Sequence, residues 1–400
     1  MNATKKVLEL LKSLSSNDIL ICLISGGGSA LLSLPTNIAG QNNDEENLKL
    51  KLETIKSVVN AGCNINKLNA VRSCLSMVKA GKLAELAYPA KIVSLIISDV
   101  INDELGVISS GPTCLLKDSS NNFLNSLDII DKHNLKEKIP KQVIQYLEAK
   151  CLEAKCTSFS SNDSQVSNYL IGNNKFATTA ILNHSALNEY NYKKILMNDL
   201  EGEAKYVGAV FACLAFLILR KKPSKHEAFQ DLNFYLNKTD FKEALLNSEI
   251  FERFDLIEKL FDENVSSLRK SQDIKVCFIS GGETTVTLAD QIGKGGRNME
   301  MTLGFELAFS GLTLTNCVLE NYELLFSSFG TDGIDGPTDS AGAYFETSQD
   351  LNKESTMDKM IFNLLSHNSY EYYSRNERLL RTGPTGTNVS DIQVLLINLK

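Results

Sequence analysis

The sequence predicts an α/β protein built on a parallel sheet. Short apolar runs alternate with segments of helical periodicity, and the run from Ile19 to Ile24 has the β-branched and aliphatic composition of a strand buried on both faces. Apolar runs at 90–98 and 276–280 also lead directly into turns of small residues. With 400 residues the chain is too long for one ordinary core, so we expect two domains with an insert between them.

The first strand leads into a glycine-rich turn. This turn consists of Ser25, Gly26, Gly27, Gly28 and Ser29, and an apolar helical start follows it. Glycine permits positive φ and lets backbone N–H groups approach a ligand, while the N-terminus of the next helix favours negative charge. The turn therefore predicts a site for a phosphate or a carboxylate, although a glycine-rich turn after a strand is more often a turn alone.

Helical patterns follow at 47–60 and 65–75. The second predicted helix carries Asn69, Arg72, Ser76 and Lys79, which lie three or four residues apart and so share one helix face. This polar face comes one crossover after the glycine turn, so it is a candidate binding surface. A solvated polar face explains the pattern equally well.

Two carboxylates come just after the second strand. Asp99 and Asp103 follow the apolar run at 90–98, and the small residues at 108–113 form another turn nearby. In a doubly wound sheet the carboxyl ends of the strands border the ligand crevice. Asp99 and Asp103 are therefore candidates for holding a hydrated Mg2+ ion or for orienting a hydroxyl group, with helix capping as the alternative.

The middle of the chain carries no candidate chemistry. Strands predicted at 169–171 and 194–197 flank a helix and indicate a further βαβ unit. The segment from Val207 to Leu219 is almost wholly apolar, but it falls short of the roughly 20 residues that a membrane helix requires, which favours a buried core helix. The charged segment 221–270 has a helical pattern, and we interpret it as an insert between domains.

The C-terminal part again combines strands with turns of small residues. A glycine-rich turn at 293–296 ends in Arg297, where a guanidinium group suits bidentate contact with a phosphate or a carboxylate. The loop at 327–339 lacks the closing glutamate of a calcium loop, which argues against calcium. The loop at 381–389 is a candidate anion cradle. The candidate binding residues of this part are Glu283, Asn298, Asp332, Asp335, Thr385, Gly386, Thr387 and Asn388.

Composition narrows the class of partner and the compartment. The net charge of −7 and the absence of a basic stripe argue against nucleic acid and acidic membranes as partners. The nine cysteines are scattered and form no Cys-x-x-Cys pair, as is typical of reduced thiols. The N-terminal 14 residues form an amphipathic pattern without a cleavage site, so they predict a helix and not a signal peptide. We expect a cytoplasmic protein that acts on a small molecule.

Taken in order, these motifs resemble those of the glycerate kinases that end in a MOFRL domain, also called class II glycerate kinases. The matching stretches run through nearly the whole chain and are 23–32, 69–84, 95–112, 170–173, 200–204, 281–287, 295–298, 330–339 and 382–391. The last two stretches are the most specific. The resemblance implies a Rossmann-like layered parallel-sheet domain, shortened at its N-terminus, and a smaller C-terminal α/β MOFRL domain.

The resemblance also implies an activity and a division of the chain. We expect the remainder of the Rossmann-like domain at 1–165, the βαβ unit and insert at 166–272, and the MOFRL domain at 273–400. The implied reaction transfers the γ-phosphoryl group of ATP to a hydroxyl of D-glycerate, with Mg2+. Asp99, Asp103 and Arg297 match the active-site positions of the family, and phosphoryl transfer depends on positioning and charge neutralisation more than on covalent chemistry.

The chain also departs from the family pattern. The resemblance implies a longer segment before the first glycine turn, with a Gly-Ala-Gly-Lys-like turn whose lysine is implicated in catalysis, and we expect this chain to lack it. Ala80, Asn102 and Met299 stand where the family usually has Gly, Gly and Gln.

These departures keep other functions open. One alternative is a truncated, catalytically silent form that only binds a ligand or a partner. A nicotinamide-dependent reductase is a weaker alternative, because the Gly-x-Gly-x-x-Gly turn with a following acidic residue is absent. Pairing of two copies into a homodimer stays open.

Overall fold

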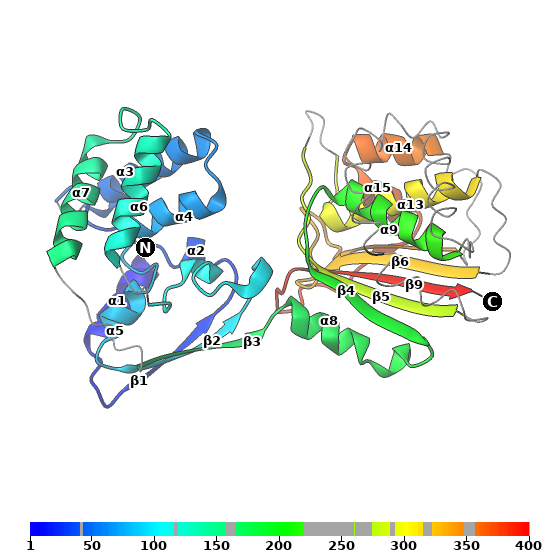
Figure 1. Cartoon of the computed structure of the whole chain (residues 1–400), viewed down its shortest axis with the longest axis horizontal. Coiled ribbons are helices and arrows are strands. Elements are labelled where there is room, and N and C mark those ends of the chain that lie inside the picture. The colour runs from blue at the N-terminus through cyan, green and yellow to red at the C-terminus, as the bar shows by residue number, and fades with distance from the viewer. Residues whose placement is uncertain are drawn as a thin grey trace. The chain divides into compact units, whose positions relative to one another are not determined.

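The computed structural model forms two compact units, Met1–Gly172 and Asn173–Lys400, each with its own sheet (Figure 1). It describes residues 1–40, 43–115, 119–156, 165–219, 260, 274–288, 293–314, 322–347 and 357–399. The insert predicted at 221–270 therefore lies outside the described residues, apart from Leu260.

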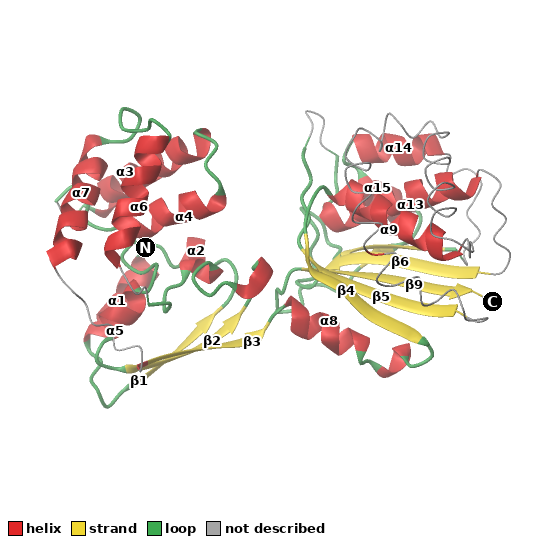
Figure 2. Ribbon diagram, viewed as in Figure 1, coloured by secondary structure: helices red, strands yellow, loops and turns green. Residues whose placement is uncertain are grey.

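The first unit contains a three-stranded parallel sheet. Its strands, in spatial order, are β1 (Ile19–Ile24), β2 (Lys91–Ile97) and β3 (Val166–Gly172). Two helices, α1 (Asn2–Lys12) and α5 (Lys82–Ala87), pack on one face of this sheet around a small apolar core (Figure 2). The parallel arrangement agrees with the prediction, and it brings the carboxyl ends of all three strands to one edge.

The prediction that β1 is buried on both faces was wrong. Its residues alternate between half-buried and exposed, and Ile19, Ile21 and Leu23 are 64%, 63% and 80% exposed. Tyr169 and Ile171 of β3 are exposed as well. The physical reason is that, within the described residues, helices cover only one face of this sheet, so the apolar composition of β1 does not translate into burial on both sides.

The other helices of the first unit pack around a second core. They are α2 (Gly28–Leu31), α3 (Asp44–Asn60), α4 (Ile65–Cys74), α6 (Ser119–Lys132) and α7 (Lys141–Cys156), with short 3-10 turns at Ile101–Asp103 and Ile108–Ser110. Asn43 and Asn64 precede α3 and α4, and each side chain accepts a hydrogen bond from a backbone N–H three residues on. These caps fix where both helices begin.

The second unit contains a six-stranded mixed sheet. Its strands, in spatial order, are β4 (Tyr192–Leu200), β5 (Ile274–Gly282), β9 (Asp391–Leu399), β6 (Tyr322–Gly330), β7 (Gly342–Glu346) and β8 (Leu379–Leu380). β4 and β5 are parallel, and all other neighbours are antiparallel. β3 and β4 enter different sheets and so do not form the βαβ unit predicted from the sequence. The domain boundaries at 165 and 272 stay a prediction.

Helices cover both faces of the second sheet. On one face lie α9 (Ala204–Leu219), α13 (Arg297–Leu314), α14 (Met357–Leu365) and α15 (Ser369–Arg375), and on the other lies α8 (Asn174–Leu182), followed by a short 3-10 turn at Ser185–Leu187 (Figure 2). Every residue of α9 from Val207 to Leu219 is buried, which confirms the predicted core helix. No described helix combines the length and apolar character needed to cross a membrane.

The packing of α9 against α13 depends on two glycines. A Cβ atom at Gly208 of α9 would lie 2.0 Å from the backbone oxygen of Met301, and one at Gly304 of α13 would lie 2.3 Å from the backbone oxygen of Lys205. Backbone atoms cannot move aside as a flexible side chain can. The two glycines therefore permit the contact between α9 and α13.

We expect Gly208→Ala to lower the free energy of unfolding of the second unit by about 1–3 kcal/mol, because the added methyl group overpacks a rigid core. Chemical denaturation followed by circular dichroism measures the change. Gly106→Ala, at an exposed position of the first unit, is the control for an added methyl group without overpacking, since a Cβ atom there meets no atom within 4 Å. Equal stability of the two variants would contradict the packing argument.

Candidate active site

The glycine-rich turn after β1 lies directly against Asp99, which follows β2. A Cβ atom at Gly26 would lie 1.9 Å from Oδ2 of Asp99, so a larger residue here would displace this carboxylate. Gly27 has a φ of 79°, a left-handed conformation that favours glycine, and it precedes α2. The hydroxyl of Ser109 donates a hydrogen bond of 2.6 Å to the backbone oxygen of Ser25. The structure thus brings the first turn, Asp99 and the second small-residue turn together.

A buried lysine connects the same turn to the polar residues predicted on the second helix. That prediction was wrong for Ser76 and Lys79, because α4 ends at Cys74. Nζ of Lys79 donates to the backbone oxygen and to the hydroxyl of Ser29, at 2.6 Å each. Arg72 donates to the Ser29 hydroxyl and to the Asn69 side chain, at 3.4 Å each. Lys79 is only 2% exposed, so the alternative of a solvated polar face does not hold for it. Four predicted binding residues therefore meet at one place.

Burial changes the acidity of Lys79. Desolvation is the largest cause, followed by the positive charges of Arg72 and Lys51, and together they lower the pKa of Lys79 to about 8. The ammonium group of Lys79 stays mostly protonated at neutral pH, but burial and the neighbouring positive charges make its charged form less stable than it is in water. An anion bound beside it would stabilise the charged form.

Asp103 lies in the short turn after β2. It is half-buried, and both Asn102 and Asp103 have positive φ, at 66° and 54°. Within the described residues, no group of three or more His, Cys, Asp or Glu side chains is placed to hold a metal ion. Mg2+ commonly uses one or two carboxylates together with water and substrate phosphates, so Asp99 and Asp103 fit that kind of site by their chemistry.

In the second unit, Arg297 is held between two carboxylates at the ends of strands. Its Nε and Nη2 donate to the two oxygens of Asp391, at 2.5 and 3.0 Å, and its Nη1 lies 2.7 Å from Glu283. Burial opposes the charged guanidinium, but the carboxylates outweigh it and raise the pKa of Arg297. The side chain remains 35% exposed, and each Nη keeps a further hydrogen that can reach a ligand.

Asp335 and Asn298 form the buried support of this arginine. Oδ1 of Asp335 accepts a hydrogen bond from the backbone N–H of Asn298, and Oδ2 accepts one from that of Met299, so Asp335 caps the first turn of α13. The Asn298 side chain accepts a hydrogen bond of 2.6 Å from the hydroxyl of Ser328. Asp335 and Asn298 were both predicted to bind a ligand, but both are almost fully buried. Their hydrogen bonds in the structure are to other groups of the protein.

The loop before β9 remains exposed. The residues from Thr385 to Asn388 are exposed, and Gly386 has a φ of 80°. The loop is anchored at Thr385, whose backbone N–H donates to the backbone oxygen of Asp332 and whose hydroxyl donates to that of Thr331. These exposed amide and hydroxyl groups are accessible to a ligand of the second unit.

Two functional candidates escaped the sequence analysis. Asp391 was named only as the end of a motif, although its position at the start of the last strand, opposite Gly282 of β5, could have signalled it. Lys51 was not singled out, because its neighbours in sequence alternate between leucine and lysine. Its place on one helical face with Asn47, Thr54 and Val58 is the signal that could have found it.

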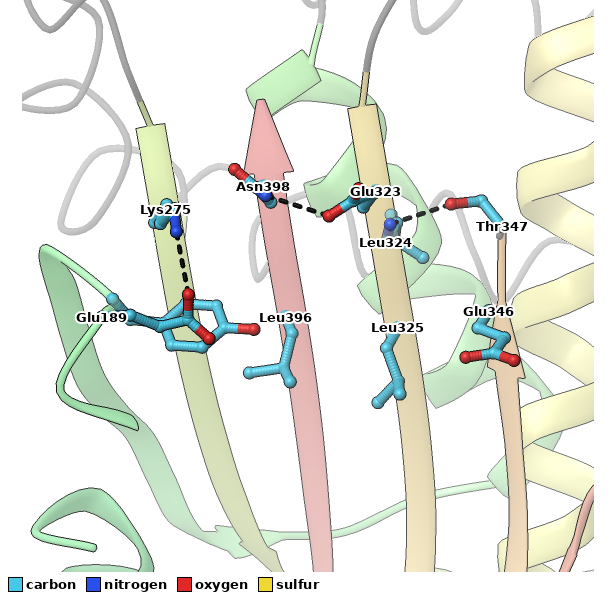
Figure 3. A pocket seen from close by; sticks show the side chains of 10 residues that line it. Glu189, Lys275, Glu323, Leu324, Leu325, Glu346, Thr347, Leu396 and Asn398 are labelled. Carbon is cyan, nitrogen blue, oxygen red and sulfur yellow. Dashed lines mark hydrogen bonds and ion pairs between the residues drawn. The ribbon is translucent and has the colours of Figure 1, made fainter. Parts of the chain in front are cut away.

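A hollow in the second unit lies at the opposite strand ends from Arg297. It has a volume of about 230 Å3 and is lined at the start of β5 and β6 and the end of β9 (Figure 3). Lys275 pairs there with Glu189 at 2.9 Å, and Asn398 donates to Glu323 at 3.0 Å. None of the predicted site residues lines this hollow.

Two family models match this chain. Residues 1–148 match the family described as domain of unknown function DUF4147, and residues 276–391 match the MOFRL family. A mouse protein named glycerate kinase is 32% identical over 403 residues, covering 100% of this chain and 71% of the mouse protein. The chain belongs to the glycerate kinase family. A glycerate 2-kinase of Pyrococcus horikoshii is 33% identical over 398 residues, covering 99% of this chain and 74% of that protein.

The fold of this glycerate kinase family member is shared with a solved structure. The crystal structure of a glycerate kinase from Thermotoga maritima superposes with a TM-score of 0.68 at 29% identity, covering 99% of this chain and 77% of that one. This likeness and the sequence relatives confirm the predicted family and the α/β fold class. They also favour the kinase over the silent truncated form and over the reductase.

Proposed function

We propose that this chain is an ATP-dependent glycerate kinase that transfers the γ-phosphoryl group to a hydroxyl of D-glycerate. The observation that carries the proposal is the meeting of Arg72 and Lys79 at Ser29, in a turn whose Gly26 lies against Asp99 at the carboxyl ends of β1 and β2. Anionic substrates need such cations, and ligands of parallel sheets bind at these strand ends. The name of the Pyrococcus relative, glycerate 2-kinase, supports the 2-hydroxyl as the acceptor.

The residues of the first unit would bind and orient the substrates. The turn from Ser25 to Ser29 would surround an anionic group with backbone N–H groups, while Arg72 and Lys79 neutralise its charge. Asp99 and Asp103 would hold Mg2+ or orient the attacking hydroxyl. When bound, Mg2+ supplies charge neutralisation on the phosphate oxygens. The remaining contribution of the protein is to fix the two reactants in line.

The residues of the second unit offer a separate contact for an anionic group. Arg297 would use its remaining Nη hydrogens to contact a phosphate or a carboxylate, and Glu283 and Asp391 would hold its planar group in one orientation. The exposed loop from Thr385 to Asn388 would add hydrogen bonds. We further propose a cytoplasmic location. Light scattering measures whether two copies of the chain form a homodimer.

The activity is tested by ADP release with ATP, Mg2+ and D-glycerate. Enolase added to the products distinguishes the acceptor, because it dehydrates 2-phosphoglycerate and not 3-phosphoglycerate. Release of ADP without an enolase signal would refute the 2-hydroxyl. No release of ADP would refute the kinase and favour the silent form, and an absorbance change of a nicotinamide cofactor with hydroxypyruvate would favour the reductase.

We expect Asp99→Asn to raise the Mg2+ concentration needed for half-maximal activity by about tenfold or more, because one charged ligand is lost. Asp99 lies against the glycine turn, whereas Asp103 lies further along the loop. We therefore expect a smaller change for Asp103→Asn. An unchanged Mg2+ dependence in the Asp99 variant would assign this residue a structural role.

A further inference from the structure

Lys51 is a buried lysine whose ammonium group has no hydrogen-bond or salt-bridge partner within the described ranges. It lies on the inward face of α3 with Asn47, Leu50 and Thr54, and it is 4% exposed. Lysine is almost never buried to this extent unless its charge is paired. The Nζ atom of Lys51 is not among the fully buried polar atoms that lack a partner, so its charged end stays open to water or to an anionic ligand.

The surroundings of Lys51 are cationic. Arg72 and Lys79 both lie close enough to interact electrostatically with Lys51, and Lys82 adds to them. The groups that Arg72 and Lys79 contact are hydroxyls, a side-chain amide and a backbone carbonyl, so these contacts leave the positive charge in place. Burial and then Arg72 and Lys82 lower the pKa of Lys51 to about 8, so the group still carries its charge at neutral pH.

We propose that Lys51, Arg72 and Lys79 form a binding site for a doubly charged phosphate group, with Lys51 as a direct ligand. A carboxylate brings one negative charge, whereas a phosphate monoester carries about −1.5 to −2 at neutral pH. Arg72 supplies a planar fork and the two lysines supply compact charges, a combination suited to several phosphate oxygens. A carboxylate would leave most of the buried positive charge unbalanced.

This inference rests on the proposed function only for the source of the phosphate, which is either the nucleotide or the phosphorylated product. Calorimetric titration with inorganic phosphate tests the site without turnover. We expect Lys51→Met to weaken phosphate binding by about tenfold or more, because a charge-assisted contact is lost. Separate titrations with ADP and with 2-phosphoglycerate then identify the source by which affinity falls.

Lys49→Met is the matched control, because Lys49 lies on the same helix and is exposed. We expect it to bind phosphate like the wild type, and we expect Lys51→Met without ligand to melt no lower than the wild type, since an unpaired buried charge is removed. Lys51→Gln serves as a second variant.

The proposal is overturned if Lys51→Met binds phosphate normally, if Lys49→Met weakens binding equally, or if only D-glycerate binding falls. It is also overturned if neither Lys51 variant folds, because a cation without a partner cannot be needed for folding. Phosphate binding through Lys51 in a chain that releases no ADP would refute the proposed kinase activity alone.

Discussion

Replacing Arg297 by lysine is expected to lower kcat/KM for glycerate phosphorylation by about 100- to 1,000-fold, or about 3–4 kcal/mol of transition-state stabilisation. The planar guanidinium is held at three nitrogens by Asp391 and Glu283, and it keeps hydrogens on Nη1 and Nη2 for a ligand. A lysine ammonium can pair with Asp391, but it cannot hold both carboxylates and a substrate oxygen in one plane.

The control separates catalysis from stability. Arg375→Lys alters an exposed arginine paired with Glu371 on α15, and we expect near-normal kinetics from it. Asp391 is almost fully buried, so Arg297→Lys also lowers thermal stability to some extent. A loss of stability with unchanged kcat/KM would show that Arg297 acts only as the partner of Asp391.

The sequence predicted the turns of the site because the conformation of a turn depends mainly on its own few residues. The glycines at 26–28 follow a run of β-branched residues, and the demand for a backbone without Cβ atoms is visible in the sequence itself. The three-residue spacing of Asn69 and Arg72, which both lie on α4, likewise follows from helix geometry. The meeting of these elements at Ser29 is consistent with the rule that parallel strands bring their carboxyl ends to one edge.

Long-range contacts set the parts that the sequence did not predict. β4 could pair with either sheet by its composition, and its hydrogen bonds to β5, far along the chain, decided the outcome. Asp391 acquires its role only because β9 runs antiparallel between β5 and β6, which places its first residue beside Gly282 and Gly330. One face of β1 is exposed because no described helix covers that side of the sheet. The amino-acid composition of a strand does not predict which helices will pack on it.

Asp335 shows how one carboxyl group can support the site through its protonation. It is 2% exposed, caps the helix that begins at Arg297, and lies close enough to Asp391 to feel its charge. Burial is the largest cause of its shift, outweighing the N–H groups of Met299 and Asn298, and it raises the pKa of Asp335 from 3.8 to about 7. The charged form is therefore the less stable one in the folded protein.

Asp335→Asn is expected to change how stability depends on pH. Because the folded-state pKa is raised above the unfolded one, the stability contributed by Asp335 is fully present below about pH 4 and is lost as the pH rises through about 7. The wild type should thus lose stability relative to Asp335→Asn across this window, by at most about 1.4 kcal/mol per pH unit.

Chemical denaturation at a series of pH values measures the difference between the two proteins. Asp339→Asn is the control in the same loop, because a hydrogen bond from Tyr370 lowers the pKa of Asp339, opposite to the shift of Asp335. Its stability should run parallel to that of the wild type. Parallel curves for Asp335→Asn as well would mean that the N–H groups at the start of α13 stabilise the Asp335 carboxylate enough to cancel its burial.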